Sequence, residues 1–207
     1  MTPAQYFDAV VPTVDMTIRS ELYHTNEFNF AVAVILSAQA TDKKVNEVTP
    51  ELFRVAPTPK KMLELGLDGL KEHIRVISFF NNKAKNIIAC AKRLIEVYGG
   101  EVPSELDDLL TLAGVGRKTA NVIRGNIYNQ PSIVVDTHVK RISKRLGFTK
   151  EDDPEKIEYE LMRKLPKDHW ILYNIQIISF GRTICEARKP KCQECFLYDL
   201  CKSKDKR

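Results

Sequence analysis

The sequence predicts an all-α protein. Apolar residues recur at the three- and four-residue spacing of an amphipathic helix over most of the chain, and capping residues or glycines separate these segments. One short run, Ser132-Ile133-Val134-Val135, has the composition of a strand. Because strands do not alternate with helices, a parallel sheet is disfavoured, and the run is expected only to extend the chain toward the next helix.

Capping signals set the expected start of each helix. Asn26 precedes a segment that is apolar on all faces, which is typical of a central buried helix. Pro3 and Pro59 suit a first helical turn, and Gly99-Gly100 suit a helix end. The expected helices run from Thr2-Pro3 through Val11, from Asn26 through Leu36, from Thr41-Asp42 through Leu52, from Thr58-Pro59 through Leu65, from Lys83 to Tyr98, from Ser104 to Leu112, from Arg117 to about Tyr128, and from Asp136 through Leu146.

Composition indicates a globular protein. Hydrophobic residues make up 43% and charged residues 29% of the 207 residues, a balance that disfavours a disordered chain. The net charge of +5 suits a polyanionic partner but does not identify one. The longest apolar run, Phe30 to Leu36, is too short to span a membrane, and the N-terminal residues lack a secretion pattern. We therefore expect a cytoplasmic protein, in which clustered cysteines favour metal binding over disulfides.

Four of the five cysteines, Cys185, Cys192, Cys195 and Cys201, fall in one short segment, with six, two and five residues between them. This set suits either an iron–sulfur cluster or a tetrahedral zinc ion. Zinc sites usually pair their ligands closely, whereas only Cys192 and Cys195 are close in sequence. The spacing therefore favours the cluster and leaves zinc open, with disulfides less favoured. Cys90 is expected to be a buried core residue.

Three cations, Arg188, Lys189 and Lys191, lie in the loop between the first two of these cysteines. A loop that is tied at both ends to a metal centre is preorganised to contact phosphates. The alternative is a solvated loop whose cations balance the negative charge of the metal–thiolate group. Lys140, Arg141, Lys144 and Arg145 follow at helical spacing elsewhere, as a phosphate track or a solvated face.

A two-glycine turn joins two expected helices in Leu112-Ala113-Gly114-Val115-Gly116-Arg117-Lys118-Thr119. Gly114 and Gly116 allow backbone angles that other residues avoid, and they expose amides near a helix start, which together suit a DNA phosphate. The pattern is that of a helix-hairpin-helix, because it lacks the spacing of a P-loop and follows no strand. A plain turn between two helices is the simpler alternative.

Lys118 and Asp136 are the candidate catalytic residues. Lys118 is expected in the first turn of a helix, where the helix dipole disfavours an ammonium group, and partial burial would favour the nucleophilic free amine further. Asp136 is expected to cap the helix of Val139, which fixes an ionised carboxylate that can stabilise positive charge or assist proton transfer. A phosphate-binding lysine and a plain helix cap are the alternatives.

Four motifs resemble, in order and in separation, the endonuclease III family of helix-hairpin-helix DNA glycosylases and AP lyases. They are Leu36-Ser37-Ala38-Gln39-Ala40-Thr41-Asp42, Gly114-Val115-Gly116-Arg117-Lys118-Thr119-Ala120-Asn121, Val135-Asp136-Thr137-His138, and Gly181-Arg182 followed by the four cysteines. The resemblance covers nearly the whole chain. It implies a [4Fe-4S] cluster on the cysteines, a six-helix domain at about residues 21–130, and a cluster domain from residues 1–20 and 131–207.

The resemblance also implies roles for individual residues. Lys118 matches the family's nucleophile and Asp136 its catalytic aspartate. The sequence departs from the family at Ala113, where proline is common, and at Ser78-Phe79, where glycine and leucine are frequent. DNA contacts are implied for Gln39, which enters the duplex, for an inserting loop from Ile77 to Phe80 that includes Phe79, and for Leu112, Gly114, Gly116, Thr119 and His138.

The activity that the resemblance implies is removal of oxidised pyrimidines from double-stranded DNA, and we expect the protein to be a monomer. The amine of Lys118 would displace the flipped base and form a Schiff base, and β-elimination would then cut the strand 3′ to the abasic site. A monofunctional mismatch glycosylase, such as the adenine-specific one, is disfavoured because it generally lacks the lysine. A non-catalytic DNA-binding protein is disfavoured because Lys118 and Asp136 are both present.

Overall fold

A computed structural model of the protein describes residues 2, 5, 6, 9, 20–204 and 206, and every regular element in these residues is a helix. The predicted all-α class is therefore confirmed. The chain divides into two compact units: Ser20–Gln130, and a second unit of Met1–Arg19 together with Pro131–Arg207. None of the described helices is long and apolar enough to cross a membrane.

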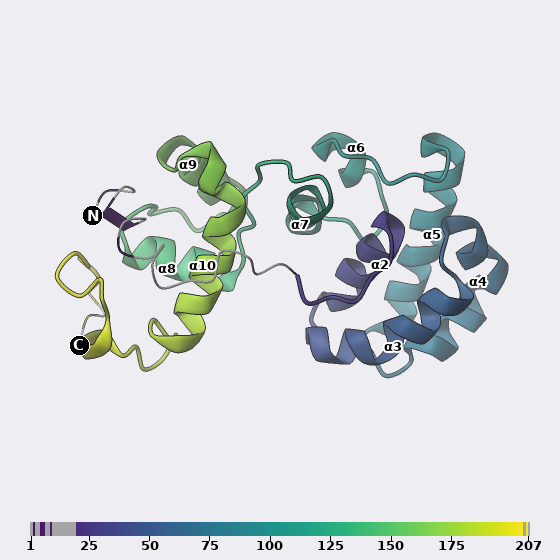
Figure 1. Ribbon diagram of the computed structural model, residues 1–207, viewed down its shortest axis with the longest axis horizontal. Coiled ribbons are helices and arrows are strands. Elements are labelled where there is room, and N and C mark those ends of the chain that lie inside the picture. Colours follow the sequence, from purple (N-terminus) through teal and green to yellow (C-terminus); the bar gives the residue numbers. More distant parts are fainter. Residues whose placement is uncertain (1, 3–4, 7–8, 10–19, 205, 207) are drawn as a thin grey trace. The chain divides into compact units, whose positions relative to one another are not determined.

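The residues Ser20–Gln130 are called the helical unit. Its helices are α2 (Glu27–Ser37), α3 (Asp42–Val55), α4 (Pro59–Ile74), α5 (Phe80–Tyr98), α6 (Leu106–Leu110) and α7 (Arg117–Ile127), shown in Figure 1. Every residue of α2 from Phe28 to Leu36 is buried, because α3, α5 and α7 all pack against this helix. The prediction of a central buried helix is confirmed.

Three predicted helix caps are confirmed in the helical unit. The side chains of Asn26, Thr41 and Thr58 each accept a hydrogen bond from the backbone amide three residues further along the chain. The first amides of a helix have no carbonyl partner within it, so these side-chain oxygens fix where α2, α3 and α4 begin. Pro59 follows Thr58 in the first turn of α4, as expected.

Two other helix starts differ from the prediction. α5 begins at Phe80 instead of Lys83, directly after Phe79, whose backbone is left-handed. Ser104 does not cap α6, which begins at Leu106. The Ser104 hydroxyl instead donates to the side chain of Glu105. A cap signal marks where a helix can begin, but the local backbone decides which residue it uses.

The second unit is called the cysteine unit, because it contains the four C-terminal cysteines. Its elements are α8 (Thr137–Arg145), α9 (Pro154–Lys164), the 3₁₀ turn η2 (Lys167–His169), α10 (Trp170–Thr183) and the 3₁₀ turn η3 (Cys192–Glu194). Sequence reasoning did not identify α9 and α10. The strand-like run from Ser132 to Val135 is neither strand nor helix and leads directly into α8, as expected.

An aromatic group lies in the core of the cysteine unit. The rings of Tyr6, Phe148 and Tyr173 lie 5.6 to 6.4 Å apart, and the hydroxyl groups of Tyr173 and Ser143 are hydrogen-bonded at 2.7 Å. Tyr6 belongs to the predicted N-terminal helix, of which Gln5, Tyr6 and Ala9 are helical. Pro3 and Val11, which were named at the two ends of that predicted helix, lie outside the described residues.

Candidate functional site

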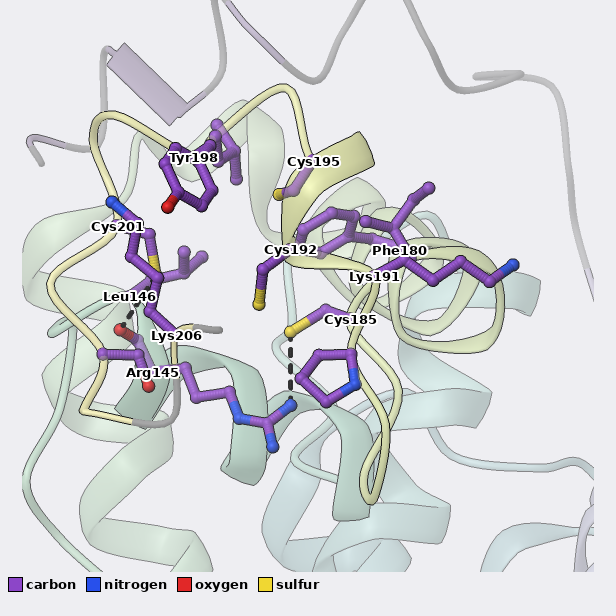
Figure 2. A pocket seen from close by; sticks show the side chains of 14 residues that line it. Arg145, Leu146, Phe180, Cys185, Lys191, Cys192, Cys195, Tyr198, Cys201 and Lys206 are labelled. Carbon is purple, nitrogen blue, oxygen red and sulfur yellow. Dashed lines mark hydrogen bonds between the residues drawn. The ribbon is translucent and has the colours of Figure 1, made fainter.

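The four C-terminal cysteines surround one pocket in the cysteine unit. Figure 2 shows Cys185, Cys192, Cys195 and Cys201 around it, together with apolar neighbours such as Leu146. All four cysteines are half-buried, and none forms a disulfide. Cys185 lies just after the end of α10, and Cys192 is the first residue of η3.

The pocket fits an iron–sulfur cluster better than a single metal ion. Among the residues that the structure describes, no three His, Cys, Asp or Glu side chains lie close enough together to hold one ion. A zinc ion needs all four sulfurs about 2.3 Å from one centre, whereas a cubane offers a separate iron to each thiolate. Burial raises the pKa of the Cys195 thiol, and the neighbouring cysteines raise it further. Four thiolates in this pocket therefore need a positive centre.

Two arginines of α8 hold the segment that carries Cys185. The guanidinium of Arg145 donates to the Cys185 sulfur at 3.4 Å, to the Glu186 carbonyl at 2.7 Å and to the Ala187 carbonyl at 3.1 Å. Arg141 donates to the Cys185 carbonyl at 3.1 Å. Hydrogen bonds from a cation to a thiolate and its backbone stabilise negative charge there, so these arginines suit a thiolate-ligated centre.

The cations of α8, predicted as a phosphate track or a solvated face, make contacts within the cysteine unit. Lys140 and Lys144 form ion pairs with Asp152, at 3.2 and 2.8 Å, while Arg141 and Arg145 hold the cysteine segment. These internal contacts occupy the cations that the sequence places on one face. Helical spacing shows which residues share a face but not what covers that face.

The loop between the first two cysteines exposes its cations. Arg188, Lys189 and Lys191 are all exposed, and the Lys191 amide donates to the Ile184 carbonyl at 2.9 Å, which closes the loop at its base. Arg145 holds the first part of the loop, as described above. A loop restrained in this way presents three positive charges with little entropy to lose on meeting a polyanion. This arrangement supports the predicted phosphate contacts.

The glycine hairpin lies between α6 and α7 of the helical unit. Gly114 has φ +82°, and a Cβ added there would lie 3.0 Å from Cβ of Asn86 and 3.3 Å from Cγ2 of Ile35. The hairpin therefore needs glycine for both its backbone angle and its close packing. Gly116 is the N-cap of α7 and is exposed. The first amides of α7 follow this exposed turn, as an anion site requires.

Lys118 lies in the first turn of α7, as predicted, and its side chain is exposed. The partial burial that would favour the free amine further is not present in the protein without DNA. Asp136 caps α8 by accepting a hydrogen bond from the Val139 amide at 2.7 Å, which confirms the predicted cap. Lys118 belongs to the helical unit and Asp136 to the cysteine unit.

His138 packs closely against α10 at Gly181. A Cβ at Gly181 would lie 2.5 Å from Nδ1 of His138 and 2.8 Å from Cδ1 of Ile142, so only glycine fits there. Burial lowers the pKa of His138, with Asp136 opposing that effect. The imidazole therefore favours its neutral form beside the cap of α8. A glycine before Arg182 is explained by this contact between α8 and α10.

Two residues predicted to enter DNA have left-handed backbones. Gln39 has φ 56° and Phe79 has φ 58°, and both side chains are exposed, Phe79 to 63%. Such angles are costly for residues other than glycine and persist only where the surrounding structure imposes them. The two exposed side chains are thus held by strained turns, the first after α2 and the second before α5.

Two other predicted DNA contacts are not available as side chains. Ile77 is 1% exposed and Leu112 is 2% exposed, and both pack in the core of the helical unit. Only their backbones can contact a ligand without unfolding the unit, so their side chains are corrected to core residues. Thr119, in contrast, is half-buried on the first turn of α7, and Ala113 is half-buried in the hairpin.

Sequence reasoning missed Lys83, although a signal was present. Lys83, Ile87, Ala91 and Leu94 follow one another at helical spacing, so the lysine belongs to the apolar face of α5. The structure places it there, 6% exposed, with Nζ 2.8 Å from the Leu36 carbonyl. A lysine on the apolar face of a helix is predicted to be buried, and this signal can be read from the sequence as directly as the lysine beside the glycine turn.

Comparisons with known proteins find similar sequences along most of the chain. Residues 32–167 match the HhH-GPD superfamily of base excision DNA repair proteins, and residues 185–201 match the iron–sulfur binding domain of endonuclease III. Endonuclease III of Haemophilus influenzae is 47% identical over 187 residues, which cover 90% of this chain and 89% of that protein. Endonuclease III of Bacillus subtilis is 48% identical over 188 residues, covering 90% and 86%.

A solved structure has a similar fold. It is a trapped covalent endonuclease III–DNA intermediate, described as an estranged-adenine complex. This chain matches it with a TM-score of 0.88 and 42% sequence identity, over 98% of this chain and 96% of that one.

Proposed function

Because this chain belongs to the endonuclease III family of base excision repair proteins, it is a DNA glycosylase and AP lyase with a [4Fe-4S] cluster, and we propose that Lys118 and Asp136 carry its chemistry. The observation that carries this proposal is the position of Lys118, in the first turn of α7 directly after the exposed glycine hairpin. The hairpin would hold a phosphate of the strand whose sugar the lysine attacks.

The proposed reaction begins when a damaged pyrimidine leaves the base stack. Nζ of Lys118 bonds to C1′ of the sugar as the bond from C1′ to the base breaks, and the base leaves with a proton. The remaining proton passes from the nitrogen to the ring oxygen O4′ as the C1′–O4′ bond breaks, which opens the sugar and gives a neutral Schiff base. Removal of a C2′ proton then expels the 3′ phosphate and cuts the strand.

Asp136 would support the first step. Its carboxylate is fixed as the cap of α8 and stabilises the positive charge that develops on the sugar. The Lys118 side chain is exposed in the first turn of α7, where bound DNA would cover it.

The remaining assignments concern binding. We assign Cys185, Cys192, Cys195 and Cys201 as the cluster ligands, where the cluster supplies a fixed positive centre for the thiolates. We further propose oxidised pyrimidines in duplex DNA as the substrates, a monomer as the active form, and the cytoplasm, where bacterial DNA lies, as the place of action. Phosphate contacts are assigned to the hairpin glycines and to the exposed cations Arg188, Lys189 and Lys191.

Borohydride trapping tests the lysine. Reduction of the Schiff base should join wild-type enzyme to a duplex that contains an oxidised pyrimidine or an abasic site. Lys118→Ala should lower the yield of trapped complex by several orders of magnitude, because no other group replaces the nucleophile. Lys92→Ala is the control, since Lys92 is exposed on α5 and pairs with Glu96. Full trapping by Lys118→Ala would disprove the assignment.

The same assay separates the alternatives. A monofunctional glycosylase would release the base and leave the abasic strand uncut and untrapped. A non-catalytic hairpin protein would bind the duplex and release no base. Strand cleavage with a trapped intermediate is the outcome expected here.

A further inference from the structure

Lys83 is a buried lysine that the proposed chemistry does not use. Its side chain is 6% exposed among the apolar residues of α5, and burial lowers its pKa. Lysines are almost never fully buried unless a partner holds the charge. The partner is the carbonyl of Leu36, to which Nζ donates at 2.8 Å. Because burying an ammonium group costs free energy, a lysine at this position is expected to have a specific role.

The acceptor lies at the end of α2. Leu36 is in the last turn, where the carbonyls lack amide partners within the helix, and that turn contains no basic residue of its own. The Lys83 ammonium therefore supplies both a donor and a positive charge at the negative end of the helix dipole. Gln39, with its left-handed backbone, follows three residues later, and the Ala40 amide closes the turn onto the Ser37 carbonyl.

The backbone of Lys83 holds the second strained turn. Its amide donates to the Phe79 carbonyl at 3.1 Å, and the Asn82 amide donates to the same oxygen at 3.1 Å. Phe79 is the left-handed cap of α5 and exposes its ring. One residue thus anchors two turns: its amide holds the turn of Phe79, and its side chain holds the turn that leads to Gln39.

We infer that Lys83 is a positioning residue that ties the Gln39 turn to the Phe79 turn, so that both exposed side chains meet the duplex in a fixed relation. This inference rests on the proposed function, in which Gln39 and Phe79 enter the DNA around the flipped nucleotide. Because Lys83 is buried, it would act through the two turns and not by contacting the DNA or the reacting sugar. Its loss leaves the amine of Lys118 intact and removes the restraint on where the two turns lie.

The test compares Lys83→Met with Lys92→Met, which removes an exposed lysine from the same helix. The probe is 2-aminopurine opposite an abasic site, because its fluorescence rises when a side chain pushes it out of the stack. Lys83→Met should lose most of this rise and increase KM about tenfold, with kcat within about twofold of wild type. Lys92→Met should match wild type in all three measurements.

A double-mutant cycle shows whether Lys83 acts through Gln39. In a Gln39→Ala background, Lys83→Met should have a much smaller effect on KM than in wild type. Equal effects in both backgrounds would overturn the inference, as would a Lys83→Met enzyme that matches Lys92→Met. Lys83→Gln, whose side-chain amide can still donate a hydrogen bond, is the second variant. If neither Lys83 variant folds, the residue is a general stability element and the positioning role is overturned.

The two proposals fail in different ways. If wild type forms no borohydride-trapped complex, the proposed function fails. If wild type is trapped and the Lys83 variants keep a normal fluorescence rise, only the positioning role fails.

Discussion

Gly114 is the residue at which the hairpin depends most on the absence of a side chain. Gly114→Ala would combine a left-handed backbone with a Cβ only 3.0 Å from that of Asn86. We expect this change to destabilise the fold by about 1–3 kcal/mol and to weaken binding to an abasic-site duplex, because the turn must shift. Urea unfolding and a DNA titration measure the two effects.

Gly99→Ala is the matched control for this prediction. Gly99 also has a positive φ, of 63°, but a Cβ there would meet nothing within 4 Å. Its substitution adds backbone strain alone, so we expect a loss of about 1 kcal/mol and no change in DNA affinity. Equal effects of both substitutions on DNA binding would show that crowding at Gly114 has no role in the hairpin.

Single residues were predicted well where their chemistry is local. Asp136 caps α8 because it directly precedes the helical residues and its carboxylate accepts from the Val139 amide, and Cys90 is buried, which raises its pKa to about 12. Ile77 and Phe79 were both assigned to an inserting loop, but one is buried and the other exposed. Which side chain of a short loop turns outward depends on the tertiary structure, which a sequence pattern does not contain.

At the scale of elements, the structural and the catalytic role of Asp136 at the cap of α8 can be tested separately. Asp136→Asn keeps an oxygen that can accept from the Val139 amide but removes the charge, so we expect nearly unchanged stability and about 100-fold slower base excision. Asp136→Ala should lose the cap as well, at a cost of about 1 kcal/mol. Single-turnover excision and thermal unfolding measure the two properties.

Asp153→Ala is the comparison, because Asp153 caps α9 through the Lys156 amide at 3.0 Å. It should lose about 1 kcal/mol of stability while base excision stays at the wild-type rate. If Asp136→Asn excised bases as fast as wild type, Asp136 would be a helix cap and nothing more.

Helix starts were predictable where a polar side chain caps the first amides, as at α2, α3, α4 and α8. α9 also has such a signal, Asp153-Pro154, which sequence reasoning overlooked. α10 has none: His169 precedes it without a side-chain cap, and apolar residues occur on all its faces. Its burial against α8, fixed by Gly181, is a tertiary fact that periodicity does not show.

At the scale of the molecule, the two units depend on the cysteine site to different degrees. Among the residues that the structure describes, those in the core of the helical unit all belong to Ser20–Gln130, and none is one of the four C-terminal cysteines. In the cysteine unit, Cys185 and Cys195 pack against the core, and Arg145 ties α8 to the segment between them. Loss of the cluster should therefore loosen the cysteine unit and leave the helical unit folded.

Oxidation followed by chelation of the iron tests this expectation. Because metal binding is coupled to folding, losing a few kcal/mol in the cysteine unit should lower the first unfolding midpoint by roughly 10 °C. Hydrogen exchange should accelerate in residues 131–204 and stay slow in α2 and α5. Cys201→Ala should reproduce the effect. Cys90→Ala should keep both the visible absorption of the cluster and the slow hydrogen exchange of the cysteine unit, since Cys90 packs in the core of the helical unit. Unchanged exchange after complete loss of iron would mean that the cysteine unit folds on its apolar core alone, and the cluster would then need another role.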